Sequence, residues 1–236
     1  MVVISQRRKS VSPGTRMRVL FSIICVLCGT GTVYAQGSTI DVSIRDASGR
    51  AVSHAVVLAH AADAAGTSAD AAAPRAVIRQ QFQQFDPGVM AVRVGTTIEF
   101  PNFDRMRHHV YSFSEARRFE IRLYSGEEVP SVTFENPGIV VIGCNIHDWM
   151  EAWIYVTDAP FFAVADASGN AVLQDLDASA YALSVWHPGL NEPVQIDGVA
   201  GVGSPRISIE LAHDFEPPSQ ERPQNDLLAR FELADQ

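Results

Sequence analysis

An apolar, mostly β-branched run that ends in a cysteine constrains this chain more than any other feature. Residues 139–143 predict a buried β-strand that delivers Cys144 to its end, and residues 153–156 return the chain to the sheet. The connection between them reads Cys144-Asn-Ile-His147-Asp-Trp-Met150. A thiolate, an imidazole and a thioether therefore share one strand-to-strand loop, where a rigid sheet can fix their geometry.

These three side chains are soft or borderline metal ligands, and a second imidazole would complete a ligand set. His108 and His109 lie upstream, on a segment that reads as an earlier strand. Two histidines, one cysteine and a weak methionine are the ligands of mononuclear blue-copper electron-transfer sites. Successive side chains of a strand point to opposite faces of the sheet, so we expect one of the two histidines to face the cysteine.

The first 35 residues predict a cleaved signal peptide rather than part of the fold. Five basic residues precede an apolar run at 19–27 that is too short to span a membrane, and Val33-Tyr34-Ala35 has the small residues of a cleavage site. We therefore expect export to the periplasm and no membrane span in the mature chain. An uncleaved membrane anchor is the alternative.

Removal of the leader changes both the cysteine count and the charge. Cys25 and Cys28 leave with it, so Cys144 is the only cysteine of the mature sequence. A lone thiol in an oxidising compartment cannot form an internal disulfide, and metal ligation would explain its presence. The mature chain has 13 arginines and no lysine against 27 acidic residues, a net charge of −14. This balance excludes a broad nucleic-acid-binding surface.

The rest of the sequence predicts an all-β protein. Short strand-like segments are separated by glycine, proline and asparagine, which favours antiparallel sandwiches. We expect strands at 39–45, 55–58, 89–94, 96–100, 110–113, 119–124, 132–134, 139–143, 153–156, 161–164, 171–173, 181–186 and 206–211. The predicted organisation is a signal peptide at 1–35, a domain at 36–157, a small second β-sandwich at 158–213 and a tail at 214–236.

Two further segments have distinctive compositions. Residues 61–76 form an alanine-rich tract that predicts a mobile surface loop, because Gly66 and polar residues interrupt the alternative, an alanine-rich helix. The string Asp-Ala-Ser-Gly-x-Ala-Val occurs at 46–52 and again at 166–172. Two strand–turn–strand units of the same kind would explain this repeat, and coincidence in a chain rich in these residues is the alternative.

Three strings together resemble the cupredoxin (plastocyanin-like) superfamily. They are Val92-Arg-Val-Gly-Thr-Thr-Ile-Glu-Phe-Pro-Asn-Phe-Asp104, His108-His-Val110 and Gly143-Cys-Asn-Ile-His-Asp-Trp-Met150. More narrowly, the last string resembles the exported cupredoxin-like proteins labelled methylamine utilization protein. The resemblance covers residues 81–156 strongly and 38–190 more loosely. The later segment around Trp186-His187-Pro188 resembles a carboxypeptidase regulatory-like β-sandwich.

The resemblance implies a Greek-key β-sandwich that holds one copper ion per chain. The ligands that it implies are His108, Cys144, His147 and Met150, with His108 preferred to His109 because of its spacing from Phe100. One departure concerns the loop after His147. Plastocyanin-like chains usually place four residues between the last histidine and the methionine, and this chain has two. The alternative for Met150 is a buried side chain that packs under the loop.

The ligand types favour copper over zinc. Zinc would accept Cys144 and two histidines, with Asp148 or water as the fourth ligand. A thioether is a poor zinc ligand, whereas a strong thiolate with a weak thioether suits both oxidation states of copper. The sequence contains no hydrolase or phosphate-binding motif. We therefore predict a protein that is not an enzyme and that carries single electrons; a catalytic Cys–His pair would leave Met150 unexplained.

Two questions about function and partners stay open at this level. The alternative function is a non-redox copper carrier, or a structural or assembly module that docks another protein. Arg105 and Arg107 lie close to His108 on an otherwise acidic chain, together with Arg117 and Arg118. A local basic rim would attract an acidic redox partner, so we predict docking at Arg105 and Arg107. The alternative is a set of solvated loop arginines.

Overall fold

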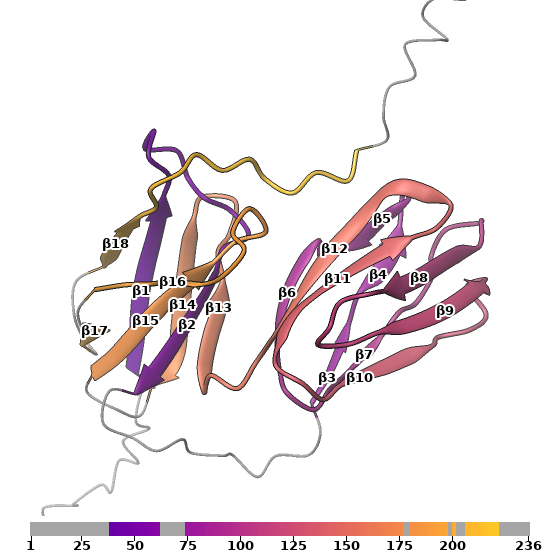
Figure 1. Cartoon of the computed structure of the whole chain (residues 1–236), viewed down its shortest axis with the longest axis horizontal. Coiled ribbons are helices and arrows are strands. Elements are labelled where there is room, and N and C mark those ends of the chain that lie inside the picture. Colours follow the sequence, from indigo (N-terminus) through magenta and orange to yellow (C-terminus); the bar gives the residue numbers. More distant parts are fainter. Residues whose placement is uncertain (1–37, 62–73, 177–179, 198–199, 202–205, 222–236) are drawn as a thin grey trace, which may run out of the picture. The chain divides into compact units, whose positions relative to one another are not determined.

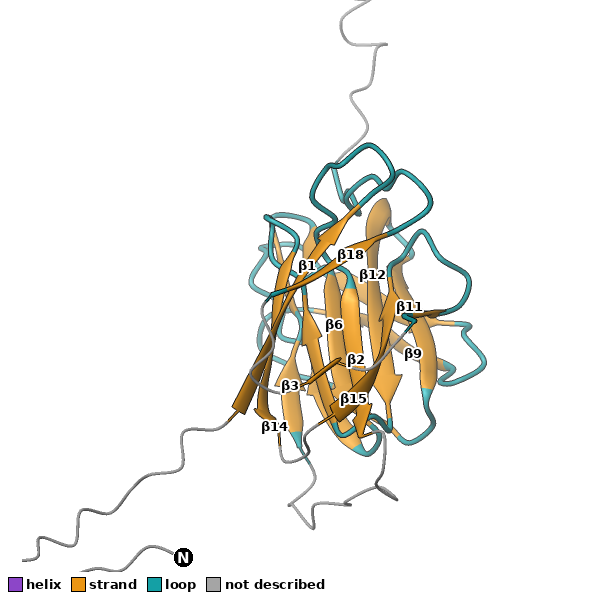
Figure 2. Cartoon of the chain, turned by 90° about the vertical axis from the view of Figure 1, so that its left-hand side faces the viewer, coloured by secondary structure: helices purple, strands orange, loops and turns teal. Residues whose placement is uncertain are grey.

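The computed structural model describes residues 38–61, 74–176, 180–197, 200–201 and 206–221. The regular elements in these ranges are all strands, joined by loops (Figures 1 and 2), and the all-β prediction is confirmed. Among the same residues, no helix has the length and apolar character needed to cross a membrane. The expected signal peptide at 1–35 lies outside the described residues, as do 62–73 of the alanine-rich tract and 222–236 of the tail.

The strands are short, and their bounds follow the sequence order of Figure 1. They are β1 (Ser38–Arg45), β2 (Val56–Ala61), β3 (Arg75–Val77), β4 (Arg79–Gln81), β5 (Gln84–Asp86), β6 (Val89–Arg93), β7 (Thr96–Glu99), β8 (His108–Ser112) and β9 (Phe119–Tyr124). They continue with β10 (Ser131–Phe134), β11 (Gly138–Cys144), β12 (His147–Thr157), β13 (Phe161–Val164), β14 (Asn170–Leu176), β15 (Ala180–Trp186), β16 (Val194–Gln195), β17 (Ala200–Gly201) and β18 (Ile207–Glu210).

Residues 75–157 form what we call the central sandwich. One of its sheets has the strand order β10-β7-β3, and the other has the order β6-β12-β11-β8-β9. Burial alternates along β11, where Val140, Ile142 and Cys144 are buried and the residues between them are partly exposed. Each fully buried aliphatic side chain of this kind contributes about 1.5–3 kcal/mol of hydrophobic free energy. Cys144 is therefore the last inward-facing position of a core strand.

A second sandwich is built from both ends of the described chain, and we call it the terminal sandwich. β1 pairs with β14 in the antiparallel sense and with β18 in parallel. β2 pairs with β13 and β15, which completes the second sheet together with β16. Its core includes Ile40, Val42, Val57, Leu173 and Leu183.

This pairing corrects the predicted division of the chain. Residues 38–61 were expected to belong to one domain spanning 36–157, but their partners are the strands at 161–210. The second sandwich is correspondingly larger than the predicted segment at 158–213. Period-two alternation identifies a strand and its buried face, but it does not identify the strand with which it pairs. The predicted loop at 61–76 is also too long at both ends, because Ala61 closes β2 and Arg75 opens β3.

The repeated string forms two turns of the same kind, as the first interpretation predicted. In each turn the aspartate backbone exchanges hydrogen bonds with residues three and four positions later, and the aspartate Oδ1 accepts two further backbone N–H groups. Gly49 and Gly169 both have positive φ, 82° and 73°, a conformation that glycine adopts without steric cost. The repeat therefore encodes the same strand–turn–strand connection twice.

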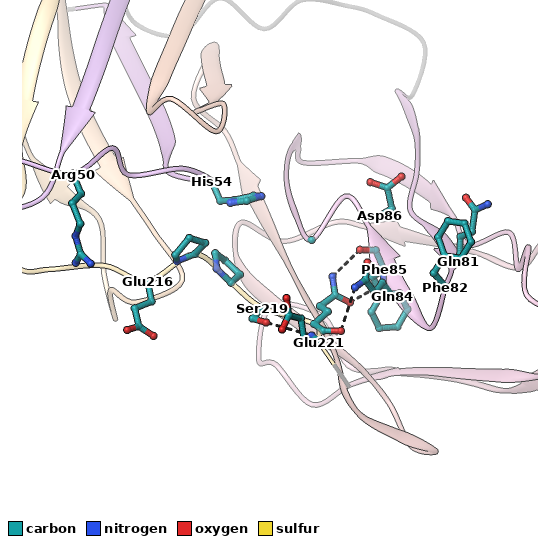
Figure 3. Close-up of a pocket in the computed structure, with 14 residues that line it drawn as sticks. Arg50, His54, Gln81, Phe82, Gln84, Phe85, Asp86, Glu216, Ser219 and Glu221 are labelled. Atoms are coloured by element: carbon teal, nitrogen blue, oxygen red, sulfur yellow. Dashed lines mark hydrogen bonds between the residues drawn. The ribbon is translucent and has the colours of Figure 1, made fainter. Parts of the chain in front are cut away.

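The first part of the predicted tail is anchored. The side-chain amide of Gln220 forms two hydrogen bonds with the backbone of Phe85 in β5: its Oε1 accepts from the amide nitrogen at 2.7 Å and its Nε2 donates to the carbonyl at 2.8 Å. Figure 3 shows the hollow beside this contact, with Phe82 and Gln81 of the β4–β5 hairpin at one end and Arg50 at the other. Segment 216–221 thus holds β5 from outside the central sandwich.

Candidate metal centre

The β11–β12 hairpin brings two of the predicted ligands together. Cys144 pairs directly with His147, so that Asn145 and Ile146 alone form the turn. The preceding pair joins Gly143 to residue 151, and the three residues between His147 and that position form a bulge. The expectation that all three ligands share one strand-to-strand loop is therefore wrong: Cys144 ends β11, and His147 and Met150 lie on β12. A bulge re-aims side chains, and here it leaves Met150 pointing inward.

His108 completes a cluster of three buried donors. It opens β8, the neighbour of β11 in the same sheet, and its side chain is fully buried. Its Nδ1 atom lies 3.8 Å from the Sγ atom of Cys144, and Nδ1 of His147 lies 3.7 Å from the same sulfur. All three ligand atoms lie within 4.8 Å of one another.

These spacings fit a single first-row metal ion. Bonds of about 2.3 Å to a thiolate and about 2.0 Å to an imidazole, the values typical of zinc, place trigonally arranged donors about 3.7 Å apart. The two sulfur-to-nitrogen distances agree with this separation. The residues present can therefore hold an ion without rearrangement of the backbone.

Met150 is the fourth predicted ligand. Its side chain is 1% exposed and belongs to the same buried cluster as Cys144. The two residues also line one hollow, together with Tyr111 and Glu151. A methionine buried beside a Cys–His–His group gives the donor set of a type 1 copper site.

The neighbouring His109 takes a different role. Its Nε2 atom lies 3.1 Å from Oε1 of Glu120 on β9, while its backbone amide donates a hydrogen bond to the sulfur of Cys144. The imidazole of His108 is the one in the donor cluster. The two neighbouring imidazoles therefore have different partners, Cys144 for His108 and Glu120 for His109.

The electrostatics of the site favour a thiolate. Burial alone raises the pKa of the Cys144 thiol, but hydrogen bonds from His108 and from the backbone amides of His109 and Ile146 hold it below its ordinary value. For His108 the sign is opposite: burial lowers the pKa of the imidazole. The contacts with Cys144 and Asp104 outweigh burial, so that the pKa of His108 lies above its ordinary value. Metal binding requires a deprotonated cysteine, so this environment prepares the sulfur as a ligand.

Sequence reasoning did not connect Asp104 with the site. Its Oδ2 atom lies 2.8 Å from Nε2 of His108, on the side of the ring away from Cys144. The spacing of four residues was a visible signal, since a carboxylate often holds the outer nitrogen of a metal-binding histidine. Trp149 also lies beside the site, with its ring centroid 5.1 Å from that of His147.

Comparison with known proteins gives structural similarities over part of the chain. No protein-family profile matches it. No curated protein sequence matches it either. Part of the chain is similar to the Cu-containing nitrite reductase of Thermus scotoductus SA-01, with 28% identity, a TM-score of 0.35 and coverage of 40% of this chain. The match spans only 25% of the nitrite reductase.

Two small cupredoxins are also similar over part of the chain. A reduced amicyanin mutant with tyrosine in place of a tryptophan matches 37% of this chain and 87% of its own, with 21% identity and a TM-score of 0.34. The purple cupredoxin of Nitrosopumilus maritimus matches 35% of this chain and 99% of its own, with 20% identity and a TM-score of 0.32. The assignment of a metal centre therefore rests on the residues of this chain and not on these similarities.

Proposed function

We propose that this chain is a type 1-like copper protein that carries single electrons between redox partners. The observation that carries the proposal is the position of the Cys144 sulfur, 3.8 and 3.7 Å from the Nδ1 atoms of His108 and His147. Met150 is buried in the same hydrophobic core as Cys144. Two imidazoles, one thiolate and a weak thioether are the ligands that blue-copper electron-transfer sites use.

Each ligand has a role that follows from its place in the fold. Bound copper would supply a centre that changes oxidation state by one electron. Cys144 would provide the strong anionic ligand, and His108 and His147 would provide two neutral imidazole nitrogens. Met150 offers a weak ligand whose identity tunes the reduction potential. Because the three strong donors come from one sheet, the site can keep its geometry when an electron arrives or leaves.

Burial supports electron transfer rather than substrate chemistry. His108 is fully buried, and Cys144 is 3% exposed, so water has little access to the strong ligands. The backbone amides of His109 and Ile146 compensate the charge of the thiolate in place of water. Fixed donors of this kind need little reorganisation when the charge of the site changes.

The cellular setting belongs to the same proposal. The basic leader and cleavage site at 1–35 support export to the periplasm. The string at 143–150 supports a place near the exported proteins labelled methylamine utilization protein, and residues 166–188 support a regulatory-like β-sandwich in the later part of the chain.

The exposed segment before His108 is the surface that we propose for a redox partner. Phe103 and Met106 are 61% and 41% exposed, and Arg105 and Arg107 lie at the surface beside them. Apolar and basic side chains thus alternate within a few residues of a ligand. This surface would suit a partner with an acidic docking face.

An optical spectrum of the purified mature chain tests the proposed function. We expect stoichiometric Cu(II) to produce an intense visible thiolate-to-copper charge-transfer band that a reductant bleaches reversibly. A zinc-loaded sample is the control and should stay colourless. A chain that holds only Cu(I), without colour in air, would contradict electron transfer and favour a copper carrier.

A further inference from the structure

The turn between β4 and β5 has an unusual backbone for its sequence. Gln81 pairs with Gln84, so that Phe82 and Gln83 form a two-residue hairpin turn. Their φ angles are 58° and 60°. Turns of this kind normally use Asn-Gly, because side chains other than glycine and asparagine are strained at positive φ. The ring of Phe82 is 81% exposed, so its packing does not hold the turn in place.

One group that holds the turn is the carboxylate of Asp104. Its Oδ1 atom accepts the amide proton of Phe82 at 2.8 Å, and its Oδ2 atom accepts that of Gln83 at 2.9 Å. The same Oδ2 atom lies 2.8 Å from Nε2 of His108. Because Nε2 faces Asp104, Nδ1 of His108 is the ring nitrogen that can bind a metal ion once it has released its proton. The carboxylate therefore joins the turn to the first histidine.

A second contact joins the turn to the other histidine. The carbonyl oxygen of Gln83 accepts a hydrogen bond from Nε1 of Trp149 at 3.2 Å. Trp149 lies in the bulge of β12, and its ring packs against the imidazole of His147. The turn thus contacts both ligand-bearing segments through its own backbone.

We propose that the turn Phe82–Gln83 is a brace for the metal centre, with Asp104 and Trp149 as positioning residues for His108 and His147. The brace acts through two amide protons and one carbonyl, which explains why its side chains need not be Asn-Gly. The role assigned to the turn rests on the proposed function, because the positions of His108 and His147 affect function only if both residues bind a metal. Its contacts, however, exist in the metal-free chain and can be measured there.

The first test uses the metal-free full-length mature chain. We expect NMR to show a slowly exchanging Nε2–H proton on His108 and protected amides at Phe82 and Gln83. Asp104→Asn should abolish the imidazole signal and accelerate amide exchange at both positions at least tenfold, because a carboxamide cannot accept three protons with both of its polar atoms. Asp148→Asn, which removes an exposed carboxylate in the bulge of β12, is the control and should change neither readout.

The second test measures copper affinity and the visible spectrum. Asp104→Asn and Trp149→Phe should each weaken copper binding by about 10–100-fold, the usual effect of losing a hydrogen-bonded neighbour of a ligand. The double variant should lose less than the product of the two single effects, since both residues act through one turn. Replacing Phe82 and Gln83 together by Asn and Gly should leave affinity unchanged, because the backbone groups remain.

Several outcomes would overturn the brace. They are wild-type amide protection in Asp104→Asn, multiplicative losses in the double variant, and a large loss of affinity on the Asn-Gly replacement. If Asp104→Asn fails to fold, the effects of Trp149→Phe and the Asn-Gly replacement still decide the question. A failure of the proposed function would be seen separately, as absence of the charge-transfer band in a wild-type chain whose turn amides are protected.

Discussion

Cys144 and His147 are direct cross-strand partners, and this pairing places Sγ of the cysteine 3.7 Å from Nδ1 of the histidine. The third donor, His108, arrives from β8 on the other side of β11, 36 residues earlier in the chain. The donors therefore come from three adjacent strands, β12, β11 and β8, of one sheet. Backbone hydrogen bonds across that sheet fix the spacing of the ligands before any metal arrives.

The thiolate provides the first prediction. Cys144→Ser should abolish the charge-transfer band and most of the copper affinity, because a hydroxyl is a far weaker donor to copper than a thiolate. The sandwich should stay folded, since the substitution is nearly isosteric. Absorption spectroscopy with metal analysis measures the loss, and far-ultraviolet circular dichroism checks the fold. A variant that retained the visible band would end the copper-site hypothesis.

The second prediction concerns Met150. Met150→Leu should retain copper and colour but raise the reduction potential, because loss of a sulfur donor disfavours the more highly charged Cu(II) state. The swap conserves volume, so it should cost less than about 1.5 kcal/mol of stability. Voltammetry of both proteins gives the comparison. An unchanged potential would mean that Met150 only packs beneath the hairpin.

The sequence predicted strands better than it predicted their partners. Residues 119–124 and 161–164 form strands with the predicted bounds, because their alternation or apolar runs are uninterrupted. β12 begins at His147 instead of residue 153, since its bulge disrupts the period of two. β4 and β5 were missed altogether: each has three residues, and Phe82-Gln83 carries no turn signal.

The candidate site was predictable where residue chemistry alone defines it. Cysteine, histidine and methionine are rare enough together that their spacing at 144–150 indicated a metal, and the spacing from Phe100 favoured His108 over His109. Of the residues around the ligands, Asp104 carried a signal in its spacing of four residues from His108, whereas the role of Trp149 depends on a turn 66 residues away in the sequence. Contacts of that kind depend on strand pairing, which a single sequence does not reveal.

The repeated turns provide a matched pair for the third prediction. Asp46 is fully buried and accepts hydrogen bonds from Ser48 and Arg50, including the Arg50 guanidinium at 2.9 Å, whereas Asp166 occupies the same turn position but is exposed. Asp46→Ala should therefore destabilise the protein more than Asp166→Ala, because the hydrogen bonds that it removes are part-buried, whereas those of Asp166 are exposed to water. Urea unfolding of both variants measures the difference. Equal losses of stability in the two variants would show that the turn geometry, and not burial, sets the contribution of each aspartate to the free energy of unfolding.

The same aspartate predicts a dependence of stability on pH. Burial alone raises the pKa of Asp46, but the hydrogen bonds from Ser48 and Arg50 lower it to about 2, from an ordinary value of 3.8. A depressed pKa means that the native state favours the charged form, so the contribution is present in full above 3.8 and is lost as the pH falls through about 2. The difference in unfolding free energy between the wild type and Asp46→Ala should therefore decrease as the pH falls from 3.8 to about 2. A gap that stays constant in acid would contradict this assignment.

The last prediction concerns the docking surface. Arg105 and Arg107 are exposed within three residues of His108, and residues 36–236 together carry a net charge of −14. Exposed charges more than about 10 Å apart are largely screened at 0.1 M salt, so the local basic rim, and not the acidic body, should govern the approach of a partner. Arg105→Glu with Arg107→Glu should slow electron transfer with an acidic partner and reverse the sign of its dependence on ionic strength. The effect should lie in the association rate, because rim charges steer encounter more than they contribute to final affinity.

Stopped-flow kinetics with the native partner over a range of salt concentrations measures this effect. Arg105→Glu alone should give an intermediate rate. Arg206→Glu changes the net charge by the same amount as Arg105→Glu alone, but on an exposed residue of the terminal sandwich. It should leave the rate close to that of the wild type. A wild-type rate that does not vary with salt, or a double variant that reacts as fast as the wild type, would exclude this face. Equal slowing by Arg206→Glu would show that overall charge, and not the rim beside His108, controls the encounter.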